Sequence, residues 1–149
     1  MGETATSITG KFLTFQVGNE EYGIAIQAVR EIIAVLPITP VPGAPAHMMG
    51  VINLRGKVIP VLSMRARFGL PPAEPHPHQV IIVVDGQSGP VGLYADRVRE
   101  VATFQEGDTE PPPSYGLQID TSLVAALGKS QGRIRILLDI QRVLAGIGG

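Results

Sequence analysis

The feature that most constrains this chain of 149 residues is an internal repeat. Residues 12–32 align with 81–101, an offset of 69 positions, and each copy has aliphatic strand patterns followed by Val-Arg-Glu and another aliphatic residue. Residues 56–63 align with 132–139 at an offset of 76, and the seven extra positions fall in loops, where insertions are tolerated. Each half is about the size of a small five-stranded barrel, whose own core is too small for comfortable stability. The repeat therefore predicts two small barrels that share an interface.

The composition favours short strands joined by sharp turns. Val and Ile supply 30 residues, while 18 Gly and 13 Pro end regular elements. The expected strands are 12–17, 22–26, 50–54, 57–62, 79–84, 91–95 and 134–138. Short helices are expected over 64–68, closed by Gly69, and over 139–144. Residues 29–36 fit either a helical turn feeding a strand or a strand alone, because eight residues are too few for periodicity to separate them.

Two proline-rich segments interrupt these elements. Prolines at 37, 40, 42 and 45 exclude regular structure from 37 to 44, and four more prolines make 70–78 the best internal boundary. We therefore expect a first barrel over about 11–70 and a second over about 79–144. The pattern leaves open whether terminal strands cross between the two barrels.

The charge balance and the hydropathy pattern argue against two classes of partner. The chain has 12 basic and 13 acidic residues, a net charge of −1 and 5% aromatic residues. A barrel that binds nucleic acid needs a basic groove with aromatic platforms and loses affinity steeply with salt, so it is a much weaker alternative. No purely apolar run, 80–84 included, approaches the length needed to cross a membrane. Without a signal-peptide pattern, the chain is expected in the cytoplasm.

The sequence contains no recognisable catalytic or metal-binding motif. Cysteine is absent, which excludes a thiolate metal site and a cysteine nucleophile. His47, His76 and His78 lie in expected loops, without the helical or acidic partners that a zinc site needs. We therefore expect no metal, no cofactor and no enzymatic activity.

One segment of thirteen residues resembles a known signature. Residues 49–61, Met-Gly-Val-Ile-Asn-Leu-Arg-Gly-Lys-Val-Ile-Pro-Val, resemble the signature of the CheW family of bacterial chemotaxis coupling proteins. Other segments occur in the order typical of the family: the opening hairpin, the first Val-Arg-Glu-Ile and the proline segment before the signature, and Leu137-Leu138-Asp139 after it. The resemblance therefore covers about 11–144. A departure occurs at Ser63, where the family usually has an acidic residue; its loss predicts a weaker cap for the following helix.

The resemblance implies a mainly β fold of two SH3-like five-stranded β-barrels packed together, with short helices, in a single CheW-like domain over 11–149. It implies a non-catalytic scaffold that couples transmembrane chemoreceptors to a histidine autokinase in chemotaxis signal transduction. The implied partners are the kinase regulatory domain, which has the same fold, and the cytoplasmic tip of the receptors, a helical hairpin. The protein would be recruited from the cytoplasm to membrane-bound receptor arrays. An adaptor of a non-flagellar pathway, controlling pili or gliding, is the alternative.

Carried over by motif, Val29, Glu31, Gly50 and Arg55 are the positions expected to contact the kinase or the receptor. Arg55 precedes Gly56 at an expected hairpin tip, where its charged planar fork suits a partner carboxylate. For Val29, simple core packing is an equal alternative. Gly50 could serve only as closely packed backbone, in which case a side chain there would disrupt binding indirectly.

Overall fold

The computed structural model describes residues 8–113, 116–117 and 119–145. Within them the chain is mainly β, with two short 3₁₀ turns, η2 and η3, and two short helices. In chain order the elements are β1 (Gly10–Val17), β2 (Glu20–Ala25), η2 (Ile26–Ala28), β3 (Val29–Ala34), β4 (Met48–Leu54), β5 (Lys57–Ser63), α1 (Met64–Arg67), β6 (Val80–Gly86), β7 (Gly89–Ala95), β8 (Arg97–Phe104), β9 (Thr109–Glu110), η3 (Thr121–Leu123), β10 (Val124–Ser130), β11 (Arg133–Leu138) and α2 (Ile140–Val143). No helix among the described residues is long and apolar enough to cross a membrane. The last four residues of the expected domain, 146–149, lie outside the described part.

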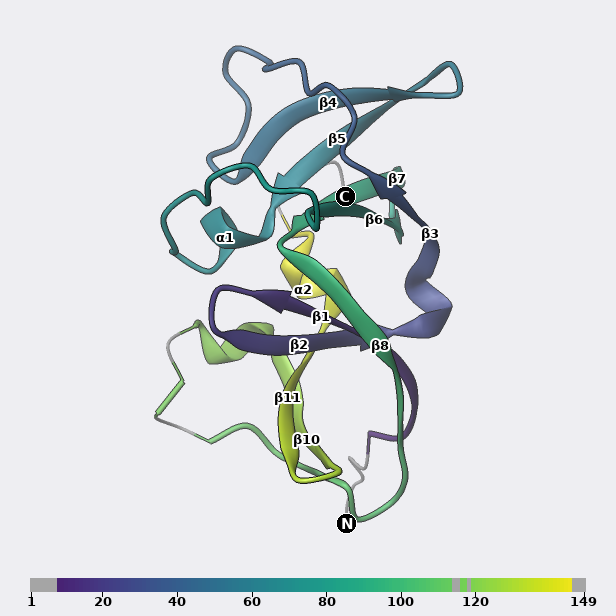
Figure 1. Cartoon of the computed structure of the whole chain (residues 1–149), viewed down its shortest axis with the longest axis vertical. Helices are drawn as coiled ribbons and strands as arrows, with labels where there is room; N and C mark the ends of the chain where they lie inside the picture. Colours follow the sequence, from purple (N-terminus) through teal and green to yellow (C-terminus); the bar gives the residue numbers. More distant parts are fainter. Residues whose placement is uncertain (1–7, 114–115, 118, 146–149) are drawn as a thin grey trace.

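The strands form two sheets, which make the two lobes of Figure 1. The 6-stranded sheet has the order β8-β1-β2-β11-β10-β9, and the 5-stranded sheet has the order β3-β6-β7-β5-β4. β10 also contacts β8, so the larger sheet curls on itself. In the smaller sheet, an isolated bridge from Thr39 to Val51 ties the segment after β3 to β4. The expected mainly β fold of two packed barrels is confirmed, with the short β9 as an additional strand.

The two repeats exchange their first hairpins. Hairpin β1–β2 of the first repeat pairs with β8 and β11 of the second, whereas β6–β7 of the second pairs with β3 and β5 of the first. The pairs β2–β11 and β5–β7 are parallel, so each exchanged hairpin is attached by one parallel and one antiparallel edge. The ranges of about 11–70 and about 79–144 therefore do not each form a sheet, because each sheet takes a hairpin from the other range.

The strand pairings are equivalent in the two sheets, as the sequence repeat predicts. Val29 lies opposite Val84 on β6, and Val98 lies opposite Phe15 on β1. Because the offset of 69 relates Val29 to Val98 and Phe15 to Val84, the two pairs are equivalent. Each ladder is also interrupted by a bulge at its Val-Arg-Glu segment, which bends the strand locally. The predicted repeat is therefore also a structural repeat.

The largest hydrophobic core lies between the two sheets. On β6, Ile82 and Val84 point into this shared core, while Ile81 and Val83 point into a smaller core within the 5-stranded sheet's own lobe. β1 divides its side chains in the same way between the shared core and a third cluster. Both faces of the exchanged hairpins are thus buried, which explains the uninterrupted apolar run at 80–84. Sharing one large core offsets the small core of each lobe.

The short helical elements resolve two sequence expectations. The open alternative over 29–36 is a 3₁₀ turn, η2, followed by strand β3. Helix α1 begins after Ser63, whose hydroxyl oxygen accepts a hydrogen bond from the Ala66 N–H at 3.0 Å. The corresponding Asp139 accepts two, from Gln141 and Arg142, at the start of α2. The cap expected to weaken at Ser63 is therefore present, with one hydrogen bond where Asp139 makes two.

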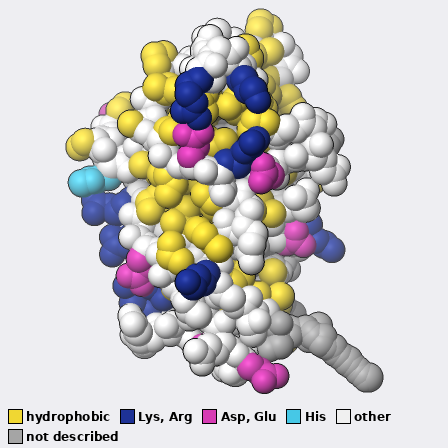
Figure 2. All heavy atoms as spheres, turned by 90° about the vertical axis from the view of Figure 1, so that its right-hand side faces the viewer, with side chains coloured by type: hydrophobic (Ala, Val, Ile, Leu, Met, Phe, Trp, Pro, Cys, Tyr) yellow, Lys and Arg dark blue, Asp and Glu magenta, His cyan; other side chains and the backbone are white. Residues whose placement is uncertain are grey.

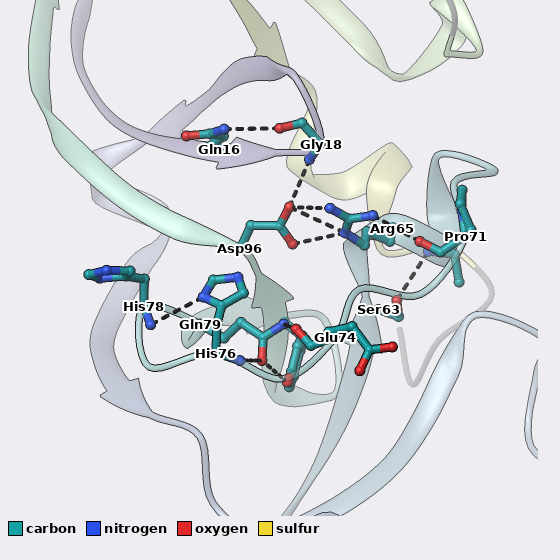
Figure 3. A network of polar contacts seen from close by, with 12 residues as sticks. Gln16, Gly18, Ser63, Arg65, Pro71, Glu74, His76, His78, Gln79 and Asp96 are labelled. Atoms are coloured by element: carbon teal, nitrogen blue, oxygen red, sulfur yellow. Dashed lines mark hydrogen bonds and ion pairs between the residues drawn. The ribbon is translucent and has the colours of Figure 1, made fainter.

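A polar network ties the two lobes together (Figure 3). Asp96, between β7 and β8, accepts hydrogen bonds from Arg65 Nη2 at 2.7 Å and from the Gly18 N–H at 2.8 Å. Arg65 lies in α1 of one lobe, and Gly18 lies in the β1–β2 turn of the other lobe. Arg65 also donates a hydrogen bond to the Pro71 carbonyl oxygen at 2.9 Å. Burial raises the pKa of the Asp96 carboxyl, but the hydrogen bonds from Arg65 and Gly18 outweigh it and hold the pKa below the ordinary value.

Candidate functional site

The turn between β4 and β5 holds a guanidinium group at the outer end of one lobe. Arg55 and Gly56 have φ values of 52° and 86°, as a two-residue type I′ hairpin turn requires. The Asn53 side-chain oxygen accepts the Gly56 N–H at 2.9 Å and fixes the turn. The Arg55 side chain is 68% exposed, so the turn presents its charge to solvent as the sequence predicts.

Arg55 forms an ion pair with Glu31 on β3. The pair joins the β4–β5 turn to the opposite edge strand of the same sheet. Exposed ion pairs contribute little to stability, about 0–1 kcal/mol. The pair therefore does little to hold the fold together; instead it holds two charged groups in a defined position on the surface.

Basic and apolar side chains lie beside this pair. Lys57 lines a hollow of about 270 Å³ together with Glu31, Arg55 and apolar residues behind them, Leu54 and Ile59. We call the surface formed by Glu31, Arg55 and Lys57 the ion-pair tip. The next residue on β5, Val58, is 69% exposed and points to the opposite face of the strand. Figure 2 shows basic and acidic side chains close together near the top of the molecule, above a band of hydrophobic side chains. The arrangement offers a charged group of each sign beside an apolar contact.

Val58 and a second apolar residue, Ile32, were not identified from the sequence, although the repeat contains the signal. Val58 aligns with Ile134, which is 58% exposed, and Ile32 aligns with Val101, which is also exposed. An aliphatic residue in a core-like pattern is ordinarily buried. Here both copies expose the same two positions, on β3 and β5 and on their counterparts β8 and β11.

The other two predicted positions lie in different surroundings. Val29 is half-buried and packs against the shared core, two residues before Glu31 on β3. Gly50 is buried near the start of β4, five residues before Arg55 and so about 16 Å away along an extended strand. The structure therefore brings Glu31 and Arg55 together. Val29 lies near them because it shares strand β3 with Glu31, whereas Gly50 lies apart from all three.

Gly50 is surrounded by backbone. A Cβ atom at this position would lie 2.2 Å from the Thr39 carbonyl oxygen, and the φ of +151° disfavours any other residue. The neighbouring Val51 exchanges two hydrogen bonds with Thr39, each of 2.9 Å. Gly50 therefore allows the 38–39 segment to approach β4 closely.

The described residues hold no group of three or more His, Asp or Glu side chains placed to bind one metal ion. His76 Nδ1 accepts a hydrogen bond from the His78 N–H at 3.2 Å within the proline-rich segment. What the ion-pair tip offers chemically is reversible recognition through charge and apolar contact.

Comparisons with known proteins agree on one family. A family model described as "CheW-like domain" matches residues 11–147. "Chemotaxis protein CheW" of Rhizobium meliloti (strain 1021) is 38% identical over 133 residues, which cover 89% of this chain and 86% of that protein. "Chemotaxis protein CheW" of Bacillus subtilis (strain 168) is 35% identical, covering 95% of this chain and 91% of that one. The crystal structure of the scaffolding protein TtCheW from Thermoanaerobacter tengcongensis superposes with a TM-score of 0.85 at 32% identity, covering 95% of this chain and 97% of that one.

Proposed function

This chain belongs to the CheW family, whose members are non-catalytic scaffold proteins of chemotaxis, and we propose that it couples chemoreceptors to a histidine autokinase. In this proposal the protein catalyses no reaction. It acts by holding two partners in a fixed relative position, so its mechanism lies in the geometry of two binding surfaces. The rigid connection between the lobes, through the shared core and the Asp96–Arg65 contacts, supports such a role.

The kinase binds through its regulatory domain, and the surface of this chain that contacts that domain is the ion-pair tip. The observation that carries this assignment is the Glu31–Arg55 pair, held by a type I′ turn beside a hollow lined by Leu54 and Ile59. A paired arginine retains unused N–H donors for partner carbonyls or carboxylates. Because the pair already holds both side chains, binding costs less side-chain entropy than it would with two free ones. Gly50 contributes indirectly, by holding the 38–39 segment against β4.

The receptor partner is the tip of a helical hairpin, and the band of hydrophobic side chains in Figure 2 is its binding surface. This face lies on the side of β3 and β8, each of which exposes an apolar residue, Ile32 and Val101. Val29 and Val98, half-buried at the start of the same strands, border the shared core. An apolar face between two lobes suits a helical partner that presents an apolar stripe. Such binding would recruit the protein to receptor arrays at the membrane.

The first experiment is a calorimetric titration of the full chain into the regulatory domain of a chemotaxis histidine kinase from the same organism. We expect saturable binding, and we expect Arg55→Glu to weaken it about tenfold or more, because the variant places like charges at the tip. Gln131→Glu is the matched control, since Gln131 occupies the equivalent turn of the other lobe with a φ of 55°. Its affinity should equal that of the wild type.

Two outcomes would contradict the proposal. Absence of binding at high micromolar concentration would exclude this kinase as the partner. Normal binding by Arg55→Glu, with urea unfolding like the wild type, would remove the ion-pair tip from the interface.

A further inference from the structure

We propose that a second surface, formed by arginines of the other lobe, binds a doubly charged oxyanion of the phosphate type. A hollow of about 440 Å³ lies where β8 meets the segment that enters β6. Its charged lining consists of Arg97, Arg99, Arg133, Glu100 and the imidazole of His78, and we call it the arginine hollow. Figure 2 shows a histidine beside several basic side chains at the left margin, away from the central hydrophobic band.

The first argument is a surplus of hydrogen-bond donors around Glu21 on β2. Glu21 pairs with Arg133, with Arg135 at 3.0 Å and with Arg99 at 3.5 Å, so one carboxylate serves three guanidinium groups. Arg135 is fully buried and also contacts Glu100 at 2.8 Å, yet its Nη1 has no acceptor among the described residues. A guanidinium group carries five N–H donors. Arg99 and Arg133, which line the hollow, therefore retain donors that Glu21 does not use.

Arg97 adds a guanidinium group whose side chain makes no hydrogen bond or ion pair with another described residue. Its neighbour Asp96 is already bound to Arg65. The lining thus has three arginines against one carboxylate, and that carboxylate, on Glu100, is turned to the buried Arg135. The surplus of two positive charges matches a dianion, and planar guanidinium groups match the oxygen geometry of phosphate.

The arginine network exists in only one of the two lobes, the one built on the 6-stranded sheet, among the described residues. The position of Arg135 is occupied in the first repeat by Ile59, and the position of Glu21 is occupied in the second by Pro90. Both Ile59 and Arg135 are buried, so an ordinary apolar core position has been replaced by a charged one. Burying a charge is costly unless it is paired. The network also fixes Arg99 and Arg133 in place before any ligand arrives, which lowers the entropy cost of binding.

The test is a titration of the ¹⁵N-labelled full chain with inorganic phosphate and with pyrophosphate, followed by NMR at constant pH and ionic strength. We expect saturable shift changes at residues 97–99 and 133. Arg97→Gln should weaken binding about tenfold, because it removes a charge-assisted hydrogen bond to the anion and breaks no side-chain hydrogen bond or ion pair with another described residue. Arg30→Gln is the matched control, since Arg30 is the exposed counterpart of Arg99 in the first repeat. It should bind like the wild type.

A phosphoserine peptide and its unphosphorylated form distinguish the two sources of the phosphate group. Tighter binding of the phosphopeptide than of free phosphate would assign the hollow to a modified side chain of a partner, and equal binding would assign it to a small anion. The proposal is wrong if sodium chloride of matched ionic strength produces the same shifts, if the shifts do not saturate, or if Arg30→Gln weakens binding as much as Arg97→Gln. The titration uses the isolated protein, so its outcome is independent of kinase or receptor binding.

Discussion

Replacing Gly50 by alanine would test whether this glycine acts through the backbone. The added Cβ would lie 2.2 Å from the Thr39 carbonyl oxygen and 2.7 Å from its carbon, so the backbone of one segment must move. The movement would separate Thr39 from Val51, which exchange two hydrogen bonds of 2.9 Å. Losing these costs about 0.5–1.5 kcal/mol each. Alanine at a φ of +151° adds backbone strain of about 1–3 kcal/mol.

The expected destabilisation of Gly50→Ala is therefore about 2–6 kcal/mol, large for a domain of ordinary stability. Gly43→Ala is the control. Gly43 lies in the connection between β3 and β4, as Thr39 does, and its φ of +76° is also unfavourable for alanine, but a Cβ there meets nothing within 4 Å. That variant should lose only about 1 kcal/mol, the cost of the unfavourable φ alone.

Urea unfolding of both variants, followed by circular dichroism, measures the two free energies on one scale. The difference between the two variants' free energies of unfolding measures the clash with Thr39 separately from the general cost of placing alanine at a positive φ. If Gly50→Ala loses no more stability than Gly43→Ala, the close-packing argument is wrong. Gly50 would then have to act by contacting a partner.

Two further predictions concern the caps and the lobe junction. Ser63→Ala should lower the free energy of unfolding by about 1 kcal/mol and Asp139→Ala by somewhat more, because Ser63 makes one capping hydrogen bond and Asp139 two; urea unfolding measures both. Equal losses would contradict this reasoning. The pKa of Asp96 is lower in the folded state than in the unfolded state, so its contribution to stability is present above the ordinary value of 3.8 and is lost as pH falls through the lowered pKa. Asp96→Asn should therefore have a lower free energy of unfolding than the wild type at pH 7. The difference between the two free energies should narrow below about pH 3.8 in acid unfolding curves, and a difference that stays constant with pH would refute this role of Asp96.

Local patterns in the sequence were enough to predict most elements and the Arg55 turn. Hairpins, caps and two-residue turns depend on neighbours in the chain, and the repeat supplied a second copy of each pattern. The Glu31–Arg55 pair joins two motifs that the sequence analysis selected separately. Val58 was missed because it stands in the continuous run Val-Ile-Pro-Val-Leu of residues 58–62, where an exposed aliphatic side chain is indistinguishable in sequence from a core residue.

The hairpin exchange could not be predicted in the same way. A hairpin such as β1–β2 presents the same two apolar faces whether it completes its own repeat or the other one, so periodicity carries no information on the choice. The burial of Arg135 is equally non-local. Its strand reads as an alternation of basic and aliphatic residues, and only the arrival of Glu21 and Glu100 from other strands makes the buried charge tolerable.

The exchanged hairpins also set the order in which the chain can fold as it leaves the ribosome. The 5-stranded sheet needs β6 and β7, so it cannot be completed before residue 95 has been made. Hairpin β1–β2, although synthesised first, has to wait for β11, which ends at residue 138. β8 can cover the β1 edge once residue 104 has been made, but the β2 edge stays uncovered until β11 follows. An uncovered strand edge favours association with other chains. Hairpin β1–β2 is therefore made before the other strands described here and is among the last to have both of its edges paired.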